Sequence, residues 1–148
     1  MDAVTPFRFH HVWHLDASVA RVFGALADVD RYAVWWPQVR RTERIDENSG
    51  HAAIRSFLPY TLDLVLRRET EDLDSGTLRV DVTGDLEGWC QWQLEAAEGT
   101  RAVFDQEAVV TPRLLARTAH VTGPLLRANH SWMMRSGRLG LAAYLHEA

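Results

Sequence analysis

The sequence predicts an α+β fold, in which an antiparallel sheet of about seven strands packs its apolar face against one long C-terminal helix. Between residues 7 and 110, apolar side chains recur with the period of two that is typical of half-buried strands, and turn residues separate these stretches. At Thr122 the period changes to the 3.6 residues of a helix. A short amphipathic segment that ends in a Trp-Trp-Pro motif at residues 35–37 separates the first strand from the others.

Length and composition favour a single domain over residues 1–148, since 47% of the residues are hydrophobic and this is ample for a core. The net charge of -4 and a pI near 5.9 give no basic patch, with which nucleic-acid recognition usually begins, so we expect no nucleic-acid partner. No apolar run approaches the roughly 20 residues of a membrane span, and residues 1–10 lack the pattern of a signal peptide. We therefore expect a cytoplasmic protein without a membrane span.

The basic and metal-ligating residues exclude several kinds of chemistry. All 16 basic residues are arginine, so a lysine Schiff base, covalently held pyridoxal phosphate and a P-loop lysine are excluded. Cys90 is the only cysteine, and the 7 histidines are scattered, so we expect no disulfide and no metal site. The chain has no GxSxG, HExxH or glycine-rich phosphate motif. We expect no cofactor.

The N-terminal part predicts a strand followed by two short helices. Alternation over residues 7–15 places on one face Phe7, Phe9, His11, Trp13 and Leu15. Asp16 or Ser18 can cap the first helix, whose apolar stripe at i, i+3, i+4 and i+7 consists of Val19, Val22, Phe23 and Leu26. Pro37 discourages helical geometry at Trp36, so the helical segment should end there.

The middle of the chain predicts strands with one dry and one wet face. The expected inner face consists of Ala52, Ile54, Ser56, Leu62, Leu64, Leu66, Leu78, Val80, Val82, Cys90, Trp92, Leu94, Ala102, Phe104, Gln106 and Ala108. The opposite face carries mostly charged and amide side chains. Arg68 lies in the inner register, where it either meets the polar end of a ligand or emerges at the sheet rim beside Glu69 or Glu71.

The last segment predicts a helix from Pro124 to about His146, with Thr122 or Gly123 as its N-cap. Its expected buried arc consists of Leu125, Leu126, Trp132, Met133, Leu139, Ala143 and Tyr144, and the opposite face of Arg127, Ser131, Arg135 and Arg138. Gly137 and Gly140 lie on or beside this arc, where they either let the helix approach the sheet or leave space between the two.

This order of elements, together with the segment WHLDASVARVFGALADVDRYAVWWP at residues 13–37, resembles the START-like (SRPBCC) proteins of the polyketide cyclase/dehydrase type. Their recurrent pattern is strand, short helix, Asp, aromatic, Trp, Pro. The resemblance implies a helix-grip fold, in which a curved sheet wraps around the C-terminal helix. It also implies an apolar cavity that binds lipids, sterols, polyketides or other hydrophobic molecules, and in some members catalyses cyclisation or aromatisation. The superfamily has no universal catalytic residue, so no catalytic role is carried over.

We expect the ligand-binding residues to be Trp13, Trp35, Trp36, Trp92, Phe104, Gln106, Asn129, Trp132, Met133 and Ser136. The cavity should lie between the aromatic strand residues and residues 129–136, because Ser136, Gly137 and Gly140 remove side-chain volume there. Trp35 or Trp36 should lie near its mouth, although both can instead staple the short helices onto the sheet.

Polar side chains on apolar faces have two interpretations each. Asn129 and Ser136 either orient a carbonyl or hydroxyl group of a ligand, or bond to groups of the protein itself. His11 is the candidate general acid or base, since imidazole titrates near neutral pH, and it can equally be a core histidine bonded to a neighbouring backbone group. Tyr144 is the second candidate catalytic residue.

Three classes of function remain open at this stage. The first is binding of a hydrophobic small molecule, lipid-like or polyketide-like. The second is a polyketide cyclase, aromatase or dehydrase that uses general acid and base groups in the same cavity. The geometry of His11 separates these two, because a ring without cavity contact leaves the enzyme without its only neutral-pH base. The third is an interaction module, in which the wet sheet face or the arginine-rich helix face binds a macromolecule or a second copy in a homodimer.

Overall fold

A computed structural model describes residues 6–55, 58, 61–112, 114 and 123–147. It contains one seven-stranded antiparallel sheet in the order β1-β7-β6-β5-β4-β3-β2. The strands are β1 (Phe7–Leu15), β2 (Val39–Arg44), β3 (Ser49–Ile54), β4 (Leu62–Asp72), β5 (Thr77–Gly84), β6 (Leu86–Ala97) and β7 (Gly99–Val110). The helices are α1 (Val19–Ala27), the 3-10 turn η1 (Val29–Arg31), α2 (Tyr32–Trp35) and α4 (Gly123–Glu147).

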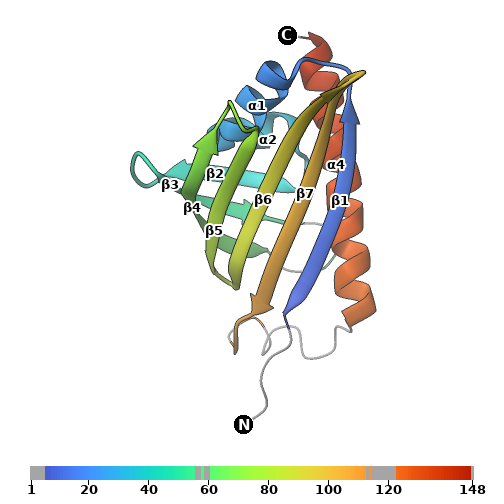
Figure 1. Ribbon diagram of the computed structural model, residues 1–148. Coiled ribbons are helices and arrows are strands. Elements are labelled where there is room, and N and C mark those ends of the chain that lie inside the picture. The colour runs from blue at the N-terminus through green and yellow to red at the C-terminus, as the bar shows by residue number, and fades with distance from the viewer. Residues whose placement is uncertain (1–5, 56–57, 59–60, 113, 115–122, 148) are drawn as a thin grey trace.

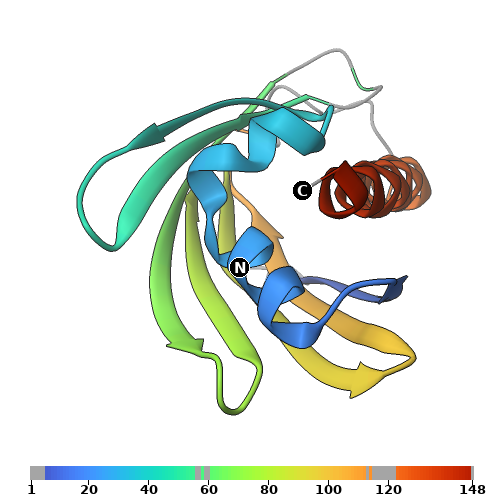
Figure 2. The same cartoon turned by 90° about the horizontal axis from the view of Figure 1, so that it is seen from above.

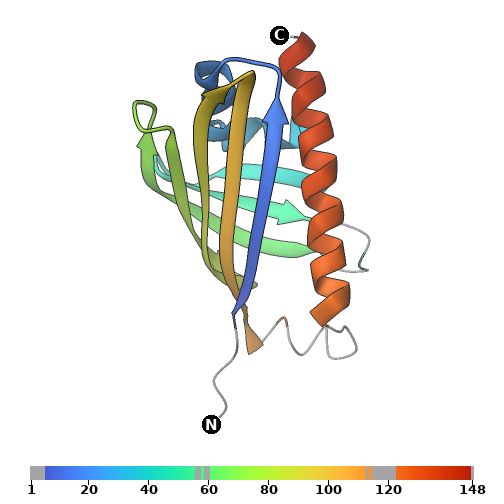
Figure 3. The ribbon, with the colours of Figure 1, turned by 45° about the vertical axis from the view of Figure 1, so that its right-hand side comes forward.

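The sheet is strongly curved, and α4 lies along its open side (Figure 1). Figure 2 shows the strands bent around an interior, with α4 opposite their concave face and α1 near one end. In Figure 3, α4 runs beside β1 over most of the length of that strand. The predicted fold class is therefore confirmed: a curved antiparallel sheet of seven strands, two short helices after the first strand, and a long C-terminal helix.

The first two strands of the chain lie at opposite edges of the sheet. β1 pairs with β7, so that Phe7 faces Ala108 and Leu15 faces Thr100. β2 pairs with β3 at the other edge. The helical segment between β1 and β2 therefore crosses from one edge of the curved sheet to the other, and it closes one end of the interior (Figure 2).

The short helices form as their sequence predicts. Ser18, rather than Asp16, is the N-cap of α1, and its Oγ accepts a hydrogen bond from the backbone N–H of Arg21 at 3.3 Å. The apolar stripe of α1 is buried against the sheet. Trp36 has an extended backbone, φ -110° and ψ 100°, and it ends α2 directly before Pro37.

The concave face of the sheet carries the core, as the alternation predicts. Along β7 every second side chain from Thr100 to Val110 is buried. The strand register then brings aromatic side chains together, since Phe104 pairs with His11 on one side and with Trp92 on the other. Ser56, which was expected on the same face, lies outside the described residues.

The expected buried arc of α4 is only partly right: Leu126, Met133 and Tyr144 are partly buried, but other members of the arc are exposed. Trp132 and Leu139 are 54% and 52% exposed, whereas Met134, Leu141 and Leu145 are buried. The buried arc is thus displaced by roughly 100°, the rotation of one residue along a helix. Large apolar side chains suggested the arc in the sequence, but they do not decide which face packs.

Two glycines decide the orientation of α4 instead. A Cβ atom on Gly137 would lie 2.5 Å from Cε2 of Trp36, and one on Gly140 would approach the carbonyl oxygen of Trp35 even more closely. Of the two alternatives that the sequence left open, these glycines therefore allow a close approach. They leave no cavity, because the tryptophan pair fills the space beside them.

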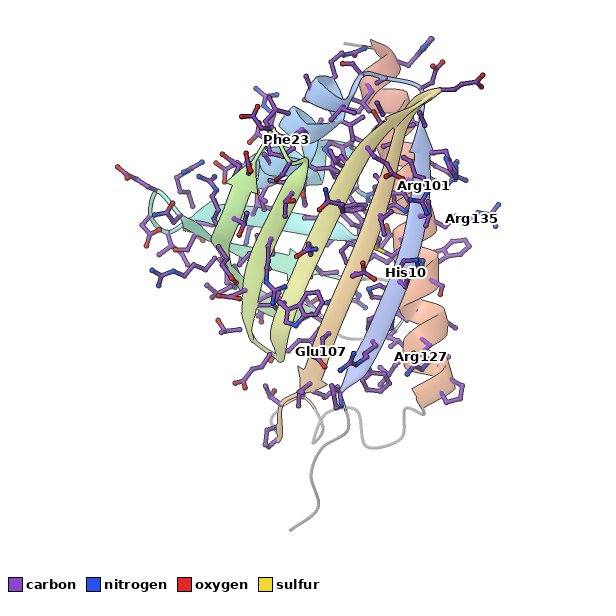
Figure 4. The ribbon with its side chains drawn as sticks, viewed as in Figure 1. His10, Phe23, Arg101, Glu107, Arg127 and Arg135 are labelled. Atoms are coloured by element: carbon purple, nitrogen blue, oxygen red, sulfur yellow. The ribbon has the colours of Figure 1, made fainter. Side chains whose placement is uncertain are left out.

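The convex face of the sheet is polar, as expected for the wet face. Nδ1 of His10 lies 2.6 Å from Oδ1 of Asp105, and Arg8 pairs with Glu107 at 2.9 Å. Figure 4 shows His10 and Glu107 on the face turned toward the viewer, with α4 behind the sheet. The charges of this face pair with one another across neighbouring strands. None of the described helices is long and apolar enough to cross a membrane.

Candidate functional site

A cavity of about 230 Å³ lies between the concave face of the sheet and α4. Its wall is mostly apolar and comes from all seven strands of the sheet, from the helical segment between β1 and β2, and from one face of α4. The apolar side chains that line it include Phe9, Leu26, Trp36, Ile54, Leu64, Leu66, Leu78, Val80, Val82, Cys90, Trp92, Phe104, Ala108, Val110, Leu126, Met133 and Met134.

A polar rim surrounds the opening of the cavity. Arg44 of β2 pairs with Asp30 of η1 at 2.6 Å, and Arg68 of β4 pairs with Glu71 at 3.3 Å. All four residues line the cavity and are partly exposed to solvent. Of the two positions that the sequence allowed for Arg68, the structure shows the one at the sheet rim beside Glu71. Both of these arginines are thus paired with a carboxylate, while the cavity wall as a whole is mostly apolar.

Three polar side chains, Gln106, Asn129 and His130, form a polar wall inside the cavity. Gln106 is only 8% exposed and lies on β7 between Phe9 of β1 and Cys90 of β6. Its Oε1 lies 2.8 Å from Nε2 of His130 on α4. This contact joins the sheet to the helix across the cavity.

His130 is held by stacking as well as by hydrogen bonding. Its ring lies on that of Phe9, with the centroids 3.7 Å apart and an interplanar angle of 12°. Burial, with a further contribution from the charge of His11, lowers the pKa of His130 to about 3. The imidazole is therefore neutral at neutral pH, and it acts as a hydrogen-bonding group rather than as a charge.

His11, the candidate acid or base, lies beside this wall but does not line the cavity of the described residues. Its ring centroid is 5.3 Å from that of His130 and 6.3 Å from that of Phe104. Burial, followed by the charge of His10, lowers its pKa. His11 is thus packed between rings, which is the geometry that leaves the predicted enzyme without its neutral-pH base.

The structure brings six of the expected ligand-binding residues together at the cavity: Trp36, Trp92, Phe104, Gln106, Asn129 and Met133. The other four lie elsewhere among the described residues: Trp13, Trp35, Trp132 and Ser136. Trp13 packs behind the wall, 4.7 Å from Trp92 between ring centroids. Trp132 points away from the sheet, because the arc of α4 is displaced.

The neighbourhood of Ser136 differs from the expectation. Its Oγ accepts a hydrogen bond from Nε2 of Gln38 at 3.1 Å, which ties α4 to the segment before β2. This is the second of the two interpretations, a bond to a group of the protein itself.

Tyr144 packs against the core beside Trp35, at the far end of α4 from the polar wall, and it does not line the cavity of the described residues.

His130 is the site residue that the sequence reasoning missed. It was counted among scattered histidines without metal-ligand spacing. Its position four residues after Leu126 and three before Met133, both of which line the cavity, is the helical signal that could have found it. That signal was hidden because the arc was centred on Trp132.

The sequence matches a known protein family. Residues 15–143 match the family described as polyketide cyclase / dehydrase and lipid transport. The chain therefore belongs to this family. Family and fold fit either the binding of a hydrophobic ligand or polyketide cyclase and aromatase chemistry. A comparison with curated protein sequences found no match.

Solved structures support the helix-grip fold. ZhuI aromatase/cyclase from Streptomyces sp. R1128 is 13% identical with a TM-score of 0.77, and the match covers 96% of this chain and 94% of that one. A START superfamily protein from Mycobacterium smegmatis is 11% identical with a TM-score of 0.70, over 96% and 97% of the two chains. A conserved protein from Geobacillus kaustophilus is 12% identical with a TM-score of 0.77, over 97% and 96%. At such identities the likeness shows the fold alone.

Proposed function

We propose that this protein binds an uncharged hydrophobic small molecule, lipid-like or polyketide-like, in the cavity between the sheet and α4. The observation that carries the proposal is the cavity itself: about 230 Å³ of space with a mostly apolar wall. Protein interiors are normally close-packed, so a space of this size calls for an occupant. The family description, which includes lipid transport, supports the same function.

The volume suggests the size of the buried part of the ligand. An apolar cavity of about 150 Å³ holds benzene. By proportion, about 230 Å³ suits roughly ten non-hydrogen atoms, the size of a naphthalene ring. A longer ligand would extend through the polar rim, where Arg44 and Arg68 could contact its polar end.

Two measurements test this proposal. Native mass spectrometry of the protein purified from its own host should show a bound small molecule that is lost on denaturation. Thermal-shift screening should find ligands among long-chain alcohols and esters, sterols and aromatic polyketides, with dissociation constants in the micromolar range or below. If no small molecule is retained and no ligand stabilises the protein, the proposal is wrong.

A polyketide cyclase, aromatase or dehydrase is the second candidate, because the fold is shared with a structure described as an aromatase/cyclase. Against it, His11 does not line the cavity of the described residues, and the pKa of His130 is about 3, so neither of these two histidines is placed as a base that works at neutral pH. The test is incubation with a synthetic poly-β-carbonyl chain and analysis of the products by mass spectrometry. Binding without acceleration over a no-protein control supports the first function, and a cyclised product formed with turnover supports the second.

A further inference from the structure

The hydrogen bond between His130 and Gln106 fixes the orientation of a buried amide. Nδ1 of His130 is occluded and has no partner within the part of the chain that the structure describes. Proteins tolerate a buried unpaired acceptor more readily than a buried unpaired N–H, so the single proton of the neutral ring lies on Nε2. Nε2 therefore donates to Oε1 of Gln106, 2.8 Å away.

This donation leaves the amide nitrogen of Gln106 as the free end of its side chain. The occluded side-chain atoms without a partner are those of Trp35, Gln38, His51, Asn129 and His130, and Nε2 of Gln106 is not one of them. This nitrogen donates no hydrogen bond within the described residues, so its NH₂ group keeps accessible surface. Because Gln106 lines the cavity from the inner face of β7, that surface opens to the cavity.

Asn129 adds a second amide to the same wall. Its Oδ1 is occluded and unpaired, whereas its Nδ2 is not among the occluded atoms. The accessible end of this side chain is therefore also an N–H donor. The polar wall thus presents donors from two elements, β7 and α4, to the cavity.

None of the three side chains of the polar wall, Gln106, Asn129 and His130, carries a charge at neutral pH. Burial keeps the pKa of His130 near 3, so the ring is neutral at neutral pH. The arginines that line the cavity, Arg44 and Arg68, are each paired with a carboxylate at the rim. A carboxylate buried against this wall would lose its hydration without gaining a cation, whereas a carbonyl oxygen needs only a donor.

We propose that Gln106, held in one orientation by His130, donates a hydrogen bond to a carbonyl oxygen of an uncharged ligand, so that the cavity prefers a ligand whose buried part carries a ketone over one of the same shape without it. This inference rests on the proposed ligand binding and adds the chemical class of the ligand. Gln106 is the ligand-contacting residue, and His130 is a positioning residue.

Two probes of the same shape separate donor recognition from apolar burial. 2-Acetylnaphthalene carries a ketone, and in 2-isopropenylnaphthalene a methylene group replaces the ketone oxygen. Equilibrium dialysis at pH 7 should give the ketone a dissociation constant about fivefold to tenfold lower, the usual net value of one hydrogen bond. 2-Naphthoate should bind more weakly than the ketone.

Variants assign this preference to Gln106. In Gln106→Met, which keeps the volume and removes the donor, the ratio of the two dissociation constants should fall to about twofold or less. Gln106→Met leaves the buried N–H of His130 without an acceptor, and this can destabilise the folded protein. The double variant Gln106→Met/His130→Phe replaces both hydrogen-bonding partners by apolar groups, so the ratio can still be measured if the single variant does not fold. Ser136→Ala is the matched control, a polar residue of α4 that does not line the described cavity, and it should keep the wild-type ratio.

The infrared carbonyl stretch of bound 2-acetylnaphthalene tests the positioning role. It should lie at lower frequency in the wild type than in Gln106→Met, and in His130→Phe it should be broad and intermediate, because the amide is no longer fixed. Equal binding of both probes to the wild type, or an unchanged ratio in Gln106→Met, would overturn the inference while leaving ligand binding intact. Binding of no probe to the wild type would overturn the proposed function, and this inference with it.

Discussion

Gly137 of α4 lies directly against the indole ring of Trp36, so closely that a Cβ atom would come within 2.5 Å of the ring. The same indole donates its Nε1 hydrogen to the carbonyl oxygen of Met133 at 2.9 Å. Met133 and Trp36 both line the cavity. The contact between glycine and tryptophan therefore sets how close α4 comes to the sheet, and with it the position of one cavity wall.

Gly137→Ala should destabilise the protein by about 1 to 3 kcal/mol, the usual cost of overpacking. The added methyl group must displace the Trp36 ring, and this cost exceeds the gain of up to about 1 kcal/mol that alanine brings to a helix interior. Urea unfolding monitored by tryptophan fluorescence measures the change. Gly24→Ala in α1 is the control, because apart from its chain neighbours and the nearby backbone of its own helix no atom lies within 4 Å of its Cβ position, and it should be stabilising. Equal effects of the two substitutions would contradict the role of the close approach.

Ala108→Leu should fill part of the cavity and abolish the thermal shift caused by bound ligands. Ala108 lines the cavity from β7, so the larger side chain occupies ligand space at a cost of about 1 to 3 kcal/mol in stability. Val109→Leu is the matched control, since the next residue of the strand faces the convex side. If Ala108→Leu binds ligands as tightly as the wild type, the ligand site lies elsewhere.

The stability of the protein should fall as the pH falls below 6.5, and His130 should contribute to this loss. Its pKa is about 3 in the folded state and near 6.5 when unfolded. The unfolded chain therefore binds a proton that the folded chain does not between these values, and each pH unit costs up to about 1.4 kcal/mol. Above pH 6.5 this contribution is constant.

Urea unfolding of the wild type and of His130→Phe at pH 7.5, 6.0 and 4.5 measures this effect. The variant keeps the stacking on Phe9 but has no titrating group, so its stability should depend less on pH. His14→Phe, at an exposed position of the same sheet, should keep the wild-type dependence. Parallel pH profiles for the wild type and His130→Phe would show that this ring does not titrate as described.

Cys90 should resist thiol reagents in the folded protein. Burial raises the pKa of its thiol to about 12, so almost no thiolate exists at pH 8. Labelling with 5,5'-dithiobis(2-nitrobenzoate) should be slow in buffer, slower still with 2-acetylnaphthalene bound, and fast in urea. The chain has no other cysteine, so the whole signal belongs to this residue. Labelling of the native protein at the rate of a free thiol would place Cys90 outside the cavity wall.

The sheet could be predicted closely from the sequence because strand alternation has a period of two. Once Phe104 was assigned to the inner face, Gln106 and Ala108 had to follow, and the register confirms them. The N-cap of α1 was equally local, since Ser18 needs only the N–H of Arg21 three residues later. Such features depend on neighbours in the chain, which a single sequence contains.

The helix side of the cavity could not be predicted in the same way. The orientation of α4 depends on Gly137 fitting Trp36, a residue about one hundred positions away, and side-chain size gave the opposite indication through Trp132. His130 was missed for a related reason. Histidines occur both buried and exposed in proteins, so the residue type alone does not predict burial. The place of His130 in the polar wall follows only from its stacking on Phe9 and its hydrogen bond to Gln106.

The position of β1 beside β7 has a consequence for the order in which the chain can fold. Phe7 pairs with Ala108 and Leu15 with Thr100, so β1 has no neighbouring strand in this sheet until about 110 residues have been made. The hairpins from β2 to β7 join consecutive strands and can assemble as the ribosome delivers them. Closing β1 onto β7 is a contact of long sequence separation, and such contacts form slowly. The binding compartment is therefore completed only after translation has passed α4, and a nascent chain cannot capture its ligand before then.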